Sequence, residues 1–310
     1  MKPLNEVRRT HLDTPKVDLG GIERTAFDWT FGADYGIADK MTLGLAFDYL
    51  VFQHDATVVD KSNYQVSTRA TTKGLSDPTI GFVYRYMASD WIGDGFARLK
   101  PSLQKKEYAG GTFVGGGQYG SSIGNNVSGS TDLSVGSKMT TESGSLEFGV
   151  TPALTYHTTA KFMQRDVFSA LNATVDSNGE DDAYITANAQ LNARHHYNKE
   201  LYAQAGANLV APFTINSKVT ETVTTAGSTT TTATATNPDV LKTSIPFHIT
   251  PSVNFGYKWT SALLVDLGFT YDRYGAGIQN TNGTTGANKG QSMTRELTSL
   301  TGALNFSYQM

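Results

Sequence analysis

Two neighbouring segments of this sequence alternate between apolar and polar side chains, and they constrain the fold more than any other feature. Residues 25–35 place Phe27, Trp29 and Phe31 at alternate positions, and residues 41–51 resume the alternation after a short turn that contains an Asp. A period of two is typical of a β-strand, whose successive side chains point to opposite faces. The sequence therefore predicts two antiparallel strands of about ten residues each, with one apolar, aromatic-rich face and one small or polar face.

The same alternation returns along the rest of the chain. It predicts strand pairs over 78–86 and 91–103, 126–141 and 145–157, 183–197 and 201–213, and 245–257 and 263–271, then one last strand that ends at Met310. Short turns are expected at 38–40, 87–90, 142–144, 198–200 and 258–261, and long loops near 54–73, 105–125, 159–182, 215–243 and 274–292. Short turns that alternate with long loops are typical of outer-membrane barrels.

Composition narrows the choice of what covers the apolar faces. A net charge of -3 gives no indication of a nucleic-acid partner, and the lack of cysteine excludes disulfides and thiolate metal sites. No apolar run reaches the roughly 18 residues of a transmembrane helix, and no apolar helix is predicted that would cover the strands. A soluble sandwich would bury the apolar face against a second sheet. Lipid is the simplest cover for a face that has no such partner.

We therefore predict an all-β protein, a transmembrane antiparallel up-and-down β-barrel of about 12 strands with short periplasmic turns and long extracellular loops. Residues 21–310 form the barrel domain, and residues 1–20 form an N-terminal tail or a weak first strand. Eleven strands are clear in the pattern, and residues 3–14 are the best candidate for an upward strand before them. The start of the chain has no apolar signal segment, so we expect that a signal peptide has been removed.

Charged side chains on the polar faces are predicted to line the lumen. They are Asp28, Asp48, Arg85, Asp94, Arg98, Lys100, Asp132, Lys138, Glu147, Arg194, Asp266 and Asp272. Matching the faces across the turn at 142–144 pairs Lys138 with Glu147, and across 258–261 it places His248 opposite Asp272. Both signs in one lumen indicate either a polar plug held by ion pairs or the lining of a wet channel.

One acidic segment carries oxygen atoms at a spacing that can wrap Ca²⁺. Its side chains are Asp176, Asn178, Glu180 and Asp182. The distal bidentate Glu of an EF-hand is missing, and we favour a solvated acidic loop tip over a metal site. No other metal site, no cofactor and no catalytic residue is predicted.

Two segments resemble known protein families. The segment GALNFSYQM at 302–310 is similar to the C-terminal assembly signal of Gram-negative outer-membrane β-barrels, with Phe306 and Tyr308 as its alternating aromatics and Met310 in place of a terminal aromatic. The segment GLSDPTIGFVYRY at 74–86 resembles a motif of the meta-pathway phenol-degradation-like transporter barrels. These resemblances imply a bacterial outer-membrane location and an uptake channel.

Together these features favour an outer-membrane channel, porin-like, for passive diffusion of small solutes. A structural or adhesive surface protein with a closed lumen and an autotransporter translocator domain are the alternatives. A channel selects by pore width and lining charge, so we do not expect an enzyme. The expected partners are outer-membrane lipid and lipopolysaccharide, the barrel assembly machinery and small solutes, with no nucleic acid.

Overall fold

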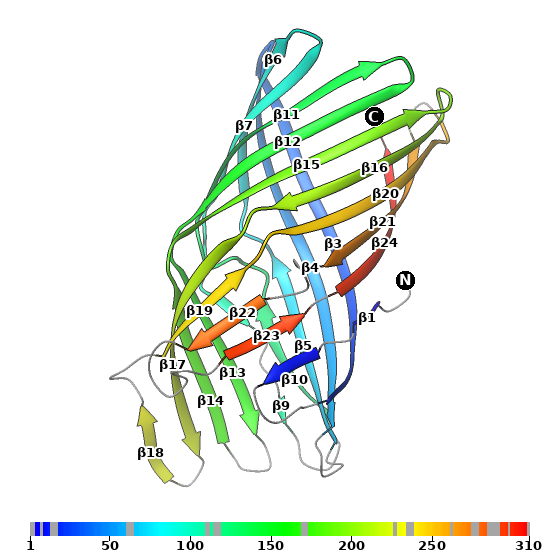
Figure 1. Ribbon diagram of the computed structural model, residues 1–310. Helices are drawn as coiled ribbons and strands as arrows, with labels where there is room; N and C mark the ends of the chain where they lie inside the picture. Colours follow the sequence, from blue (N-terminus) through cyan, green and yellow to red (C-terminus); the bar gives the residue numbers. More distant parts are fainter. Residues whose placement is uncertain are drawn as a thin grey trace.

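The computed structural model is all-β in the part of the chain that it describes (Figure 1). That part comprises residues 4–6, 9–12, 18–59, 65–108, 112–113, 119–168, 173–225, 228–233, 239–260, 263–273, 279–283, 292–296 and 298–308. No helix in these residues is long and apolar enough to cross a membrane.

Eleven strands form one continuous curved sheet, which we call the wall. They are β3 (Asp18–Ala38), β4 (Met41–Val59), β6 (Thr79–Ala88), β7 (Trp91–Lys100), β11 (Asp132–Ser143), β12 (Leu146–His157), β15 (Tyr184–His196), β16 (Leu201–Val210), β20 (His248–Lys258), β21 (Leu263–Arg273) and β24 (Thr298–Tyr308). Each strand pairs with the next one in this order, and every pairing is antiparallel. This up-and-down order confirms the predicted fold class.

The short turns lie together at one end of the wall, the upper end in Figure 1. They follow β3, β6, β11, β15 and β20, within one or two residues of the predicted positions. Gly144 has a φ of 63°, a left-handed conformation that glycine adopts without strain, and it forms the turn between β11 and β12. We call this end of the wall the short-turn end and the opposite end the hairpin end.

The predicted long loops are wrong in one respect, because each contains β-strands. They are β5 (Gln65–Leu75), β8 (Lys106–Tyr108), β9 (Thr112–Phe113), β10 (Tyr119–Asn125), β13 (Ala160–Phe168), β14 (Ala173–Asp181), β17 (Phe213–Thr225), β18 (Ser228–Ala233), β19 (Asp239–Ile245), β22 (Gln279–Gly283) and β23 (Ser292–Glu296). These strands continue the wall strands, and most of them pair with one another in an extension of the wall that we call the hairpin sheet. β5 joins this extension to the wall, because it pairs with β4 on one side and with β10 on the other. Thr-rich and polar sequences have high β-propensity and can pair without an apolar face.

Two short strands near the N-terminus lie between the first and last strands of the sheet. β1 (Leu4–Glu6) pairs with β3 and contacts β24, and β2 (Arg9–Leu12) pairs with β23. Both run antiparallel to their partners, so two short strands stand where one strand within residues 3–14 was predicted. The described residues contain no ladder between β24 and β3 themselves.

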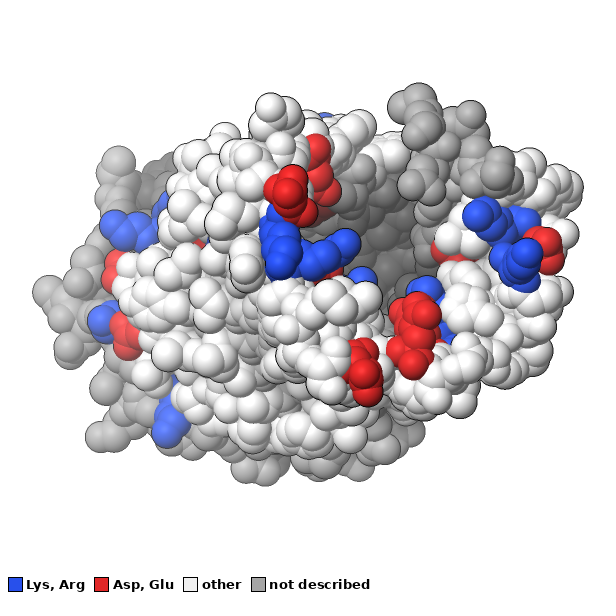
Figure 2. Space-filling view, turned by 90° about the horizontal axis from the view of Figure 1, so that it is seen from above, with Lys and Arg blue, Asp and Glu red and all other residues white. Residues whose placement is uncertain are grey.

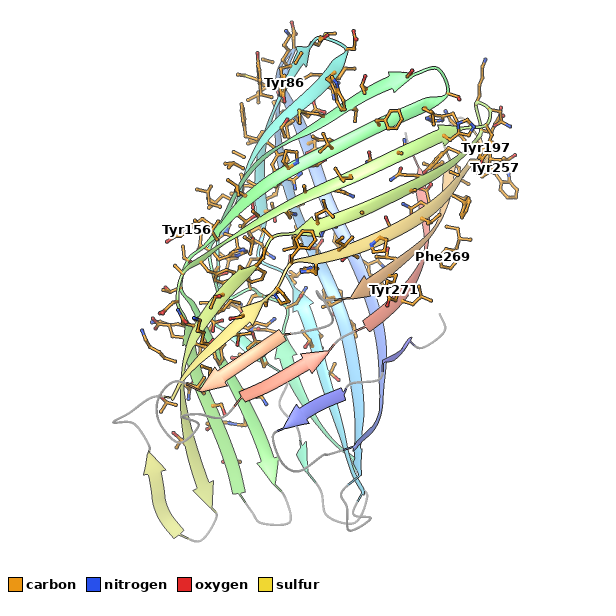
Figure 3. The ribbon with its side chains drawn as sticks, viewed as in Figure 1. Tyr86, Tyr156, Tyr197, Tyr257, Phe269 and Tyr271 are labelled. Carbon is orange, nitrogen blue, oxygen red and sulfur yellow. The ribbon has the colours of Figure 1, made fainter. Side chains whose placement is uncertain are left out.

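The two faces of the wall differ in chemistry. The outward face carries exposed large apolar side chains along its strands, among them Phe31, Leu45, Phe148, Leu191, Phe255 and Leu267. Figure 3 shows Tyr156 and Tyr257 pointing away from the interior of the wall. Buried apolar side chains among the described residues are only Val127, Ala160 and Ile245, which lie where the wall meets the hairpin sheet. The described residues therefore form no packed core behind the apolar face.

Candidate functional site

The strand register places the predicted lumen residues on the face opposite to the apolar one. Arg85, Asp94 and Lys138 lie side by side on β6, β7 and β11, one rung away from the outward-facing Tyr84 and Tyr86. The guanidinium of Arg85 donates two hydrogen bonds to Asp94, with N–O distances of 2.8 Å and 3.1 Å. Such a bidentate pair fixes both side chains against the inner face.

A second polar cluster crosses four strands of the wall nearer the short-turn end. Arg194 donates to the side-chain oxygen of Gln204 from Nε at 3.0 Å and from Nη2 at 2.8 Å, and its Nη1 donates to Glu147 at 3.3 Å. The guanidinium also lies 4.5 Å from the ring centre of Tyr202, whose hydroxyl donates to Asp266. Charges of both signs are thus tied together across β12, β15, β16 and β21.

Gly256 allows the Tyr202 side chain to reach Asp266. Tyr202 on β16 and Asp266 on β21 are separated by β20, and Gly256 is the residue of β20 between them. A Cβ atom at Gly256 would lie 2.2 Å from the Tyr202 ring and 2.5 Å from the Asp266 carboxylate. Glycine is therefore required for the Tyr202 side chain to cross the strand and meet Asp266.

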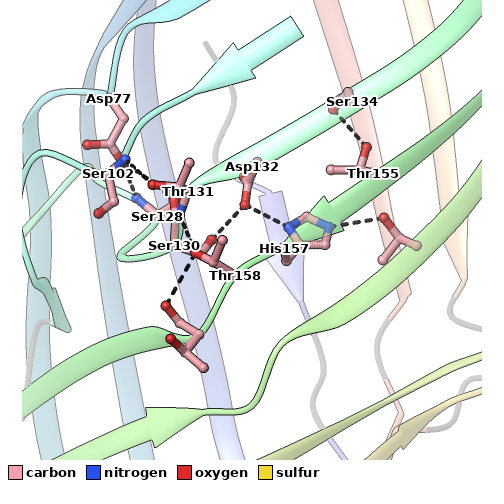
Figure 4. Close-up of polar contacts among 12 residues, drawn as sticks. Asp77, Ser102, Ser128, Ser130, Thr131, Asp132, Ser134, Thr155, His157 and Thr158 are labelled. Atoms are coloured by element: carbon pink, nitrogen blue, oxygen red, sulfur yellow. Dashed lines mark hydrogen bonds and ion pairs between the residues drawn. The ribbon is translucent and has the colours of Figure 1, made fainter. Parts of the chain in front are cut away.

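A third set of polar contacts marks the level where the wall meets the hairpin sheet (Figure 4). Asp132 accepts hydrogen bonds from the Ser130 hydroxyl at 2.7 Å and pairs with Nδ1 of His157 at 2.9 Å. Nε2 of His157 lies 3.0 Å from the Thr186 hydroxyl, and the imidazole stacks on Tyr184 with 4.4 Å between ring centres. These contacts join β11, β12 and β15 on their inner face.

The order hydroxyl, imidazole, carboxylate in Thr186, His157 and Asp132 is also the order found in hydrolase triads. Such chemistry needs convergent N–H donors for an oxyanion. Thr186 itself is paired with Thr155 within the ladder of β12 and β15. We interpret the set as a structural link between strands.

Asp77 is the most buried charged side chain of the described residues and was not predicted as a site. Its side chain is 1% exposed. Oδ1 accepts from the backbone N–H of Leu103 at 3.0 Å, and Oδ2 accepts from the N–H and hydroxyl of Ser128 at 2.8 Å and 2.9 Å. Three donors satisfy a buried carboxylate that would otherwise be costly. Only the Asp-Pro step within 74–86 marked this position in the sequence.

These hydrogen bonds stabilise a place where two segments of the chain exchange positions between the wall and the hairpin sheet. In the wall the order is β6, β7, β11, β12, whereas in the hairpin sheet β5 pairs with β10, and β13 pairs with β8 and β9. The chain leaving β7 and the chain entering β11 therefore exchange places between the two sheets. Leu103 lies on the first of these connections and Ser128 on the second, so Asp77 ties both to the break between β5 and β6.

Two predicted pairings are wrong because the turns lie further along the chain than expected. Ser143 pairs with Leu146, which places Glu147 opposite Glu142 and next to Arg194, and not opposite Lys138. In the same way Ile249 pairs with Arg273, so His248 does not oppose Asp272. A shift of two or four residues keeps the face but changes the partner.

The remaining predicted residues are only partly described. Arg98 and Lys100 lie on β7 on the same face as Asp94, and Arg98 lies 4.4 Å from the ring centre of Phe96. The side chains of Asp28 and Asp272 lie outside the described side chains, while their backbones lie on β3 and β21. Asp48 lies on β4, where its backbone exchanges hydrogen bonds with Ser76.

The acidic segment at 176–182 is not a loop. It runs along β14, where the guanidinium of Arg165 donates to Asp176 at 2.6 Å and 2.9 Å and Nζ of Lys105 donates to Asn178 at 2.8 Å. An extended strand spreads alternate side chains about 7 Å apart, too far to wrap one cation. No group of three His, Asp or Glu side chains placed to hold a metal occurs in the described part of the chain.

Seen from the short-turn end, the molecule is hollowed, and acidic and basic side chains gather around the opening (Figure 2). The Arg85 side chain is 64% exposed although it lies on the inner face. Water therefore reaches the inner face at this level. An exposed lining of mixed charge can attract, repel and orient small polar solutes by electrostatics alone.

Comparison with known proteins finds structural likeness without a family. No family model matches the chain, and no curated protein matches it. The structure is similar to an outer membrane channel from Pseudomonas putida F1, with 12% identity, a TM-score of 0.44, and 98% of this chain and 95% of that chain covered. It is also similar to OmpT, an outer membrane protein of Vibrio cholerae, with 10% identity, a TM-score of 0.27, and 97% of each chain covered. At TM-scores below 0.5 these likenesses assign no function.

Proposed function

We propose that the protein is an outer-membrane channel for passive diffusion of small solutes. The observation that supports it is the contrast between the two faces of one wall. In the described residues the outward face is apolar and exposed, and the inward face carries exposed charges such as Arg85. In this proposal a bilayer covers the outward face, and water fills the lumen beside the inward face.

Selection in such a channel comes from the lining, with no bond made or broken. Of the twelve residues predicted to line the lumen, seven are acidic and five are basic. Arg85 with Asp94 and Arg194 with Glu147 neutralise each other locally. We expect small conductance with a weak preference for cations, because the excess of acid is slight and a narrow lumen screens charge poorly.

Recording from the purified protein in a planar bilayer tests the proposal. Discrete current steps with a reversal potential slightly on the cation side are expected in a salt gradient. Asp48→Lys should move the reversal potential toward anions, whereas the control Asp90→Lys, in the turn outside the wall, should move it much less. A folded protein that gives no current steps would contradict the channel.

A structural surface protein with a closed lumen is the second candidate. The hairpin sheet favours it, since β13, β14 and β17 extend the chain well beyond the apolar band of the wall. Under either proposal the partners are outer-membrane lipid, lipopolysaccharide and the barrel assembly machinery. If folded protein gives no current steps in a planar bilayer, this second candidate becomes the leading one.

A further inference from the structure

Three lysines surround a hollow of about 350 Å³ on the hairpin sheet. Lys105 lies between β7 and β8, Lys161 on β13 and Lys218 on β17. The rest of the lining consists of Asn178, Gly179, Glu180 and Thr220. Three cationic side chains and one anionic side chain line the hollow, and this excess of positive charge favours an anion there.

The lysines are placed by their neighbours and remain exposed. Nζ of Lys105 donates to the side-chain oxygen of Asn178 at 2.8 Å, and Nζ of Lys218 lies 3.4 Å from a carboxylate oxygen of Asp182. Lys161 and Lys218 flank Glu180 on one rung of the sheet. An ammonium group has three donors, so each lysine can keep its contact and still bind a further oxygen.

The hollow lies on the outer face of the hairpin sheet. Tyr184 faces inward with His157, and its ring stacks on Phe213 of β17, so the face of β17 that carries Phe213 points inward. Ser217 lies on that same face, and its hydroxyl donates to Asp181 at 2.5 Å. Lys218 is the next residue after Ser217 and therefore points to the opposite, outer face.

The level of the hollow matches the lipid surface. Tyr156 and Ile185 pair with each other and are the last exposed apolar residues of β12 and β15 before the hairpin sheet. Lys161 follows Tyr156 by five residues along the same course of chain. At a rise of roughly 3.3 Å per residue and a tilt near 40°, this is about 13 Å, and a lysine side chain can reach back about half of that distance.

We propose that Lys105, Lys161 and Lys218 bind a phosphate group on an outer-leaflet lipid headgroup. The orientation in the membrane rests on the proposed function. A lipid is favoured over a free phosphate because its acyl chains would lie on Tyr156 and Ile185 while its phosphate reaches the lysines. Basic pockets at the edge of an apolar band recognise anionic headgroups in this way.

The test uses the full chain in detergent without phosphate and measures binding of bisphosphorylated lipid A by native mass spectrometry. A second measurement uses the same lipid A after dephosphorylation. A third adds inorganic phosphate as a competitor of the bisphosphorylated lipid. We expect the bisphosphorylated lipid to bind at least about tenfold more tightly than the dephosphorylated one. Inorganic phosphate should compete only at far higher concentration than the lipid.

The variant that carries both Lys161→Gln and Lys218→Gln should lose this preference, whereas Lys199→Gln in a short turn should keep it. Both variants are first checked for the heat-dependent mobility of a folded barrel. Equal binding of the two lipids, or an unchanged double variant, would overturn the site. Competition by inorganic phosphate at the same concentration as the lipid would make it a soluble-anion site and overturn the lipid assignment.

Bilayer recording of the same preparations separates the two proposals. Normal current steps without any phosphate preference would overturn the lipid site alone. A phosphate preference that depends on Lys161 and Lys218, seen with a silent bilayer, would overturn the channel and leave the site standing.

Discussion

Leu191 and Gln190 are neighbours on β15 and offer a direct test of which face meets lipid. Leu191 points outward and is 40% exposed, and Gln190 points inward on a rung with Thr151 and Asn208. Each is changed to Arg in a separate variant. The two variants have the same length, charge and strand, and they differ in the face that receives the guanidinium.

The depth of Leu191 sets the size of the expected effect. Leu191 follows Ile185, at the hairpin-end edge of the apolar face, by six residues, which at the usual rise and tilt is about 15 Å along the membrane normal. An apolar band is about 25 Å tall, so Leu191 lies near its middle. Arg at that depth costs about 2–4 kcal/mol, whereas Arg at Gln190 meets water and should change stability by only about 0.5 kcal/mol.

Reversible unfolding by urea in lipid vesicles measures both values on the same scale. The midpoint should fall clearly for Leu191→Arg and stay close to the parent for Gln190→Arg, with unchanged slopes. A loss of stability that is equal for both variants, or larger for Gln190→Arg, would refute the assignment of the outward face to lipid. The channel proposal would then lose its physical basis.

Three further predictions concern the hairpin end. Asp77→Ala leaves three donors without their acceptor and should cost about 3 kcal/mol or more, with a smaller loss for Asp77→Asn; urea unfolding of both variants checks this order. The Arg165 guanidinium lowers the pKa of Asp176, so this pair stabilises the β13–β14 hairpin above the usual Asp pKa and ceases to do so as the pH falls through the lowered value. Limited proteolysis against pH should show this loss in the parent and not in Arg165→Gln. On intact cells, external protease should cut within 215–243 and spare 142–144, and the reverse result would invert the topology.

The wall could be predicted from sequence because its information is local. A side-chain period of two fixes the strands, and a membrane protein shows it clearly since one face meets lipid and the other meets water. Leu267 and Phe269 therefore fall on the outward face as expected. The choice of partner across a turn depends on where the turn closes, which the alternation does not fix. The predicted faces of the strands are therefore correct, whereas the predicted cross-strand partners of Lys138 and His248 are wrong.

Close approach between strands is also invisible in the sequence. Gly268 would be the obvious inward control for Leu267→Arg, as it is the next residue on β21. In the structure a Cβ at Gly268 would lie 2.4 Å from Oδ1 of Asn254, so any side chain there would also displace the Asn254 side chain. Gln190 has no such restriction. The register across three strands is needed to choose between the two controls.

The strand exchange at Asp77 shows how one local break decides a non-local arrangement. Pro78 has no N–H and cannot continue the ladder with β4, so β5 ends at Leu75 and β6 begins at Thr79. The gap leaves the Asp77 carboxylate free to turn away from the ladder and collect donors from Leu103 and Ser128. Those two residues lie 25 residues apart on the chain, and only the exchange brings them to one carboxylate. A buried carboxylate is stable only when it is fully paired, so the same residue that needs the exchange also holds it in place.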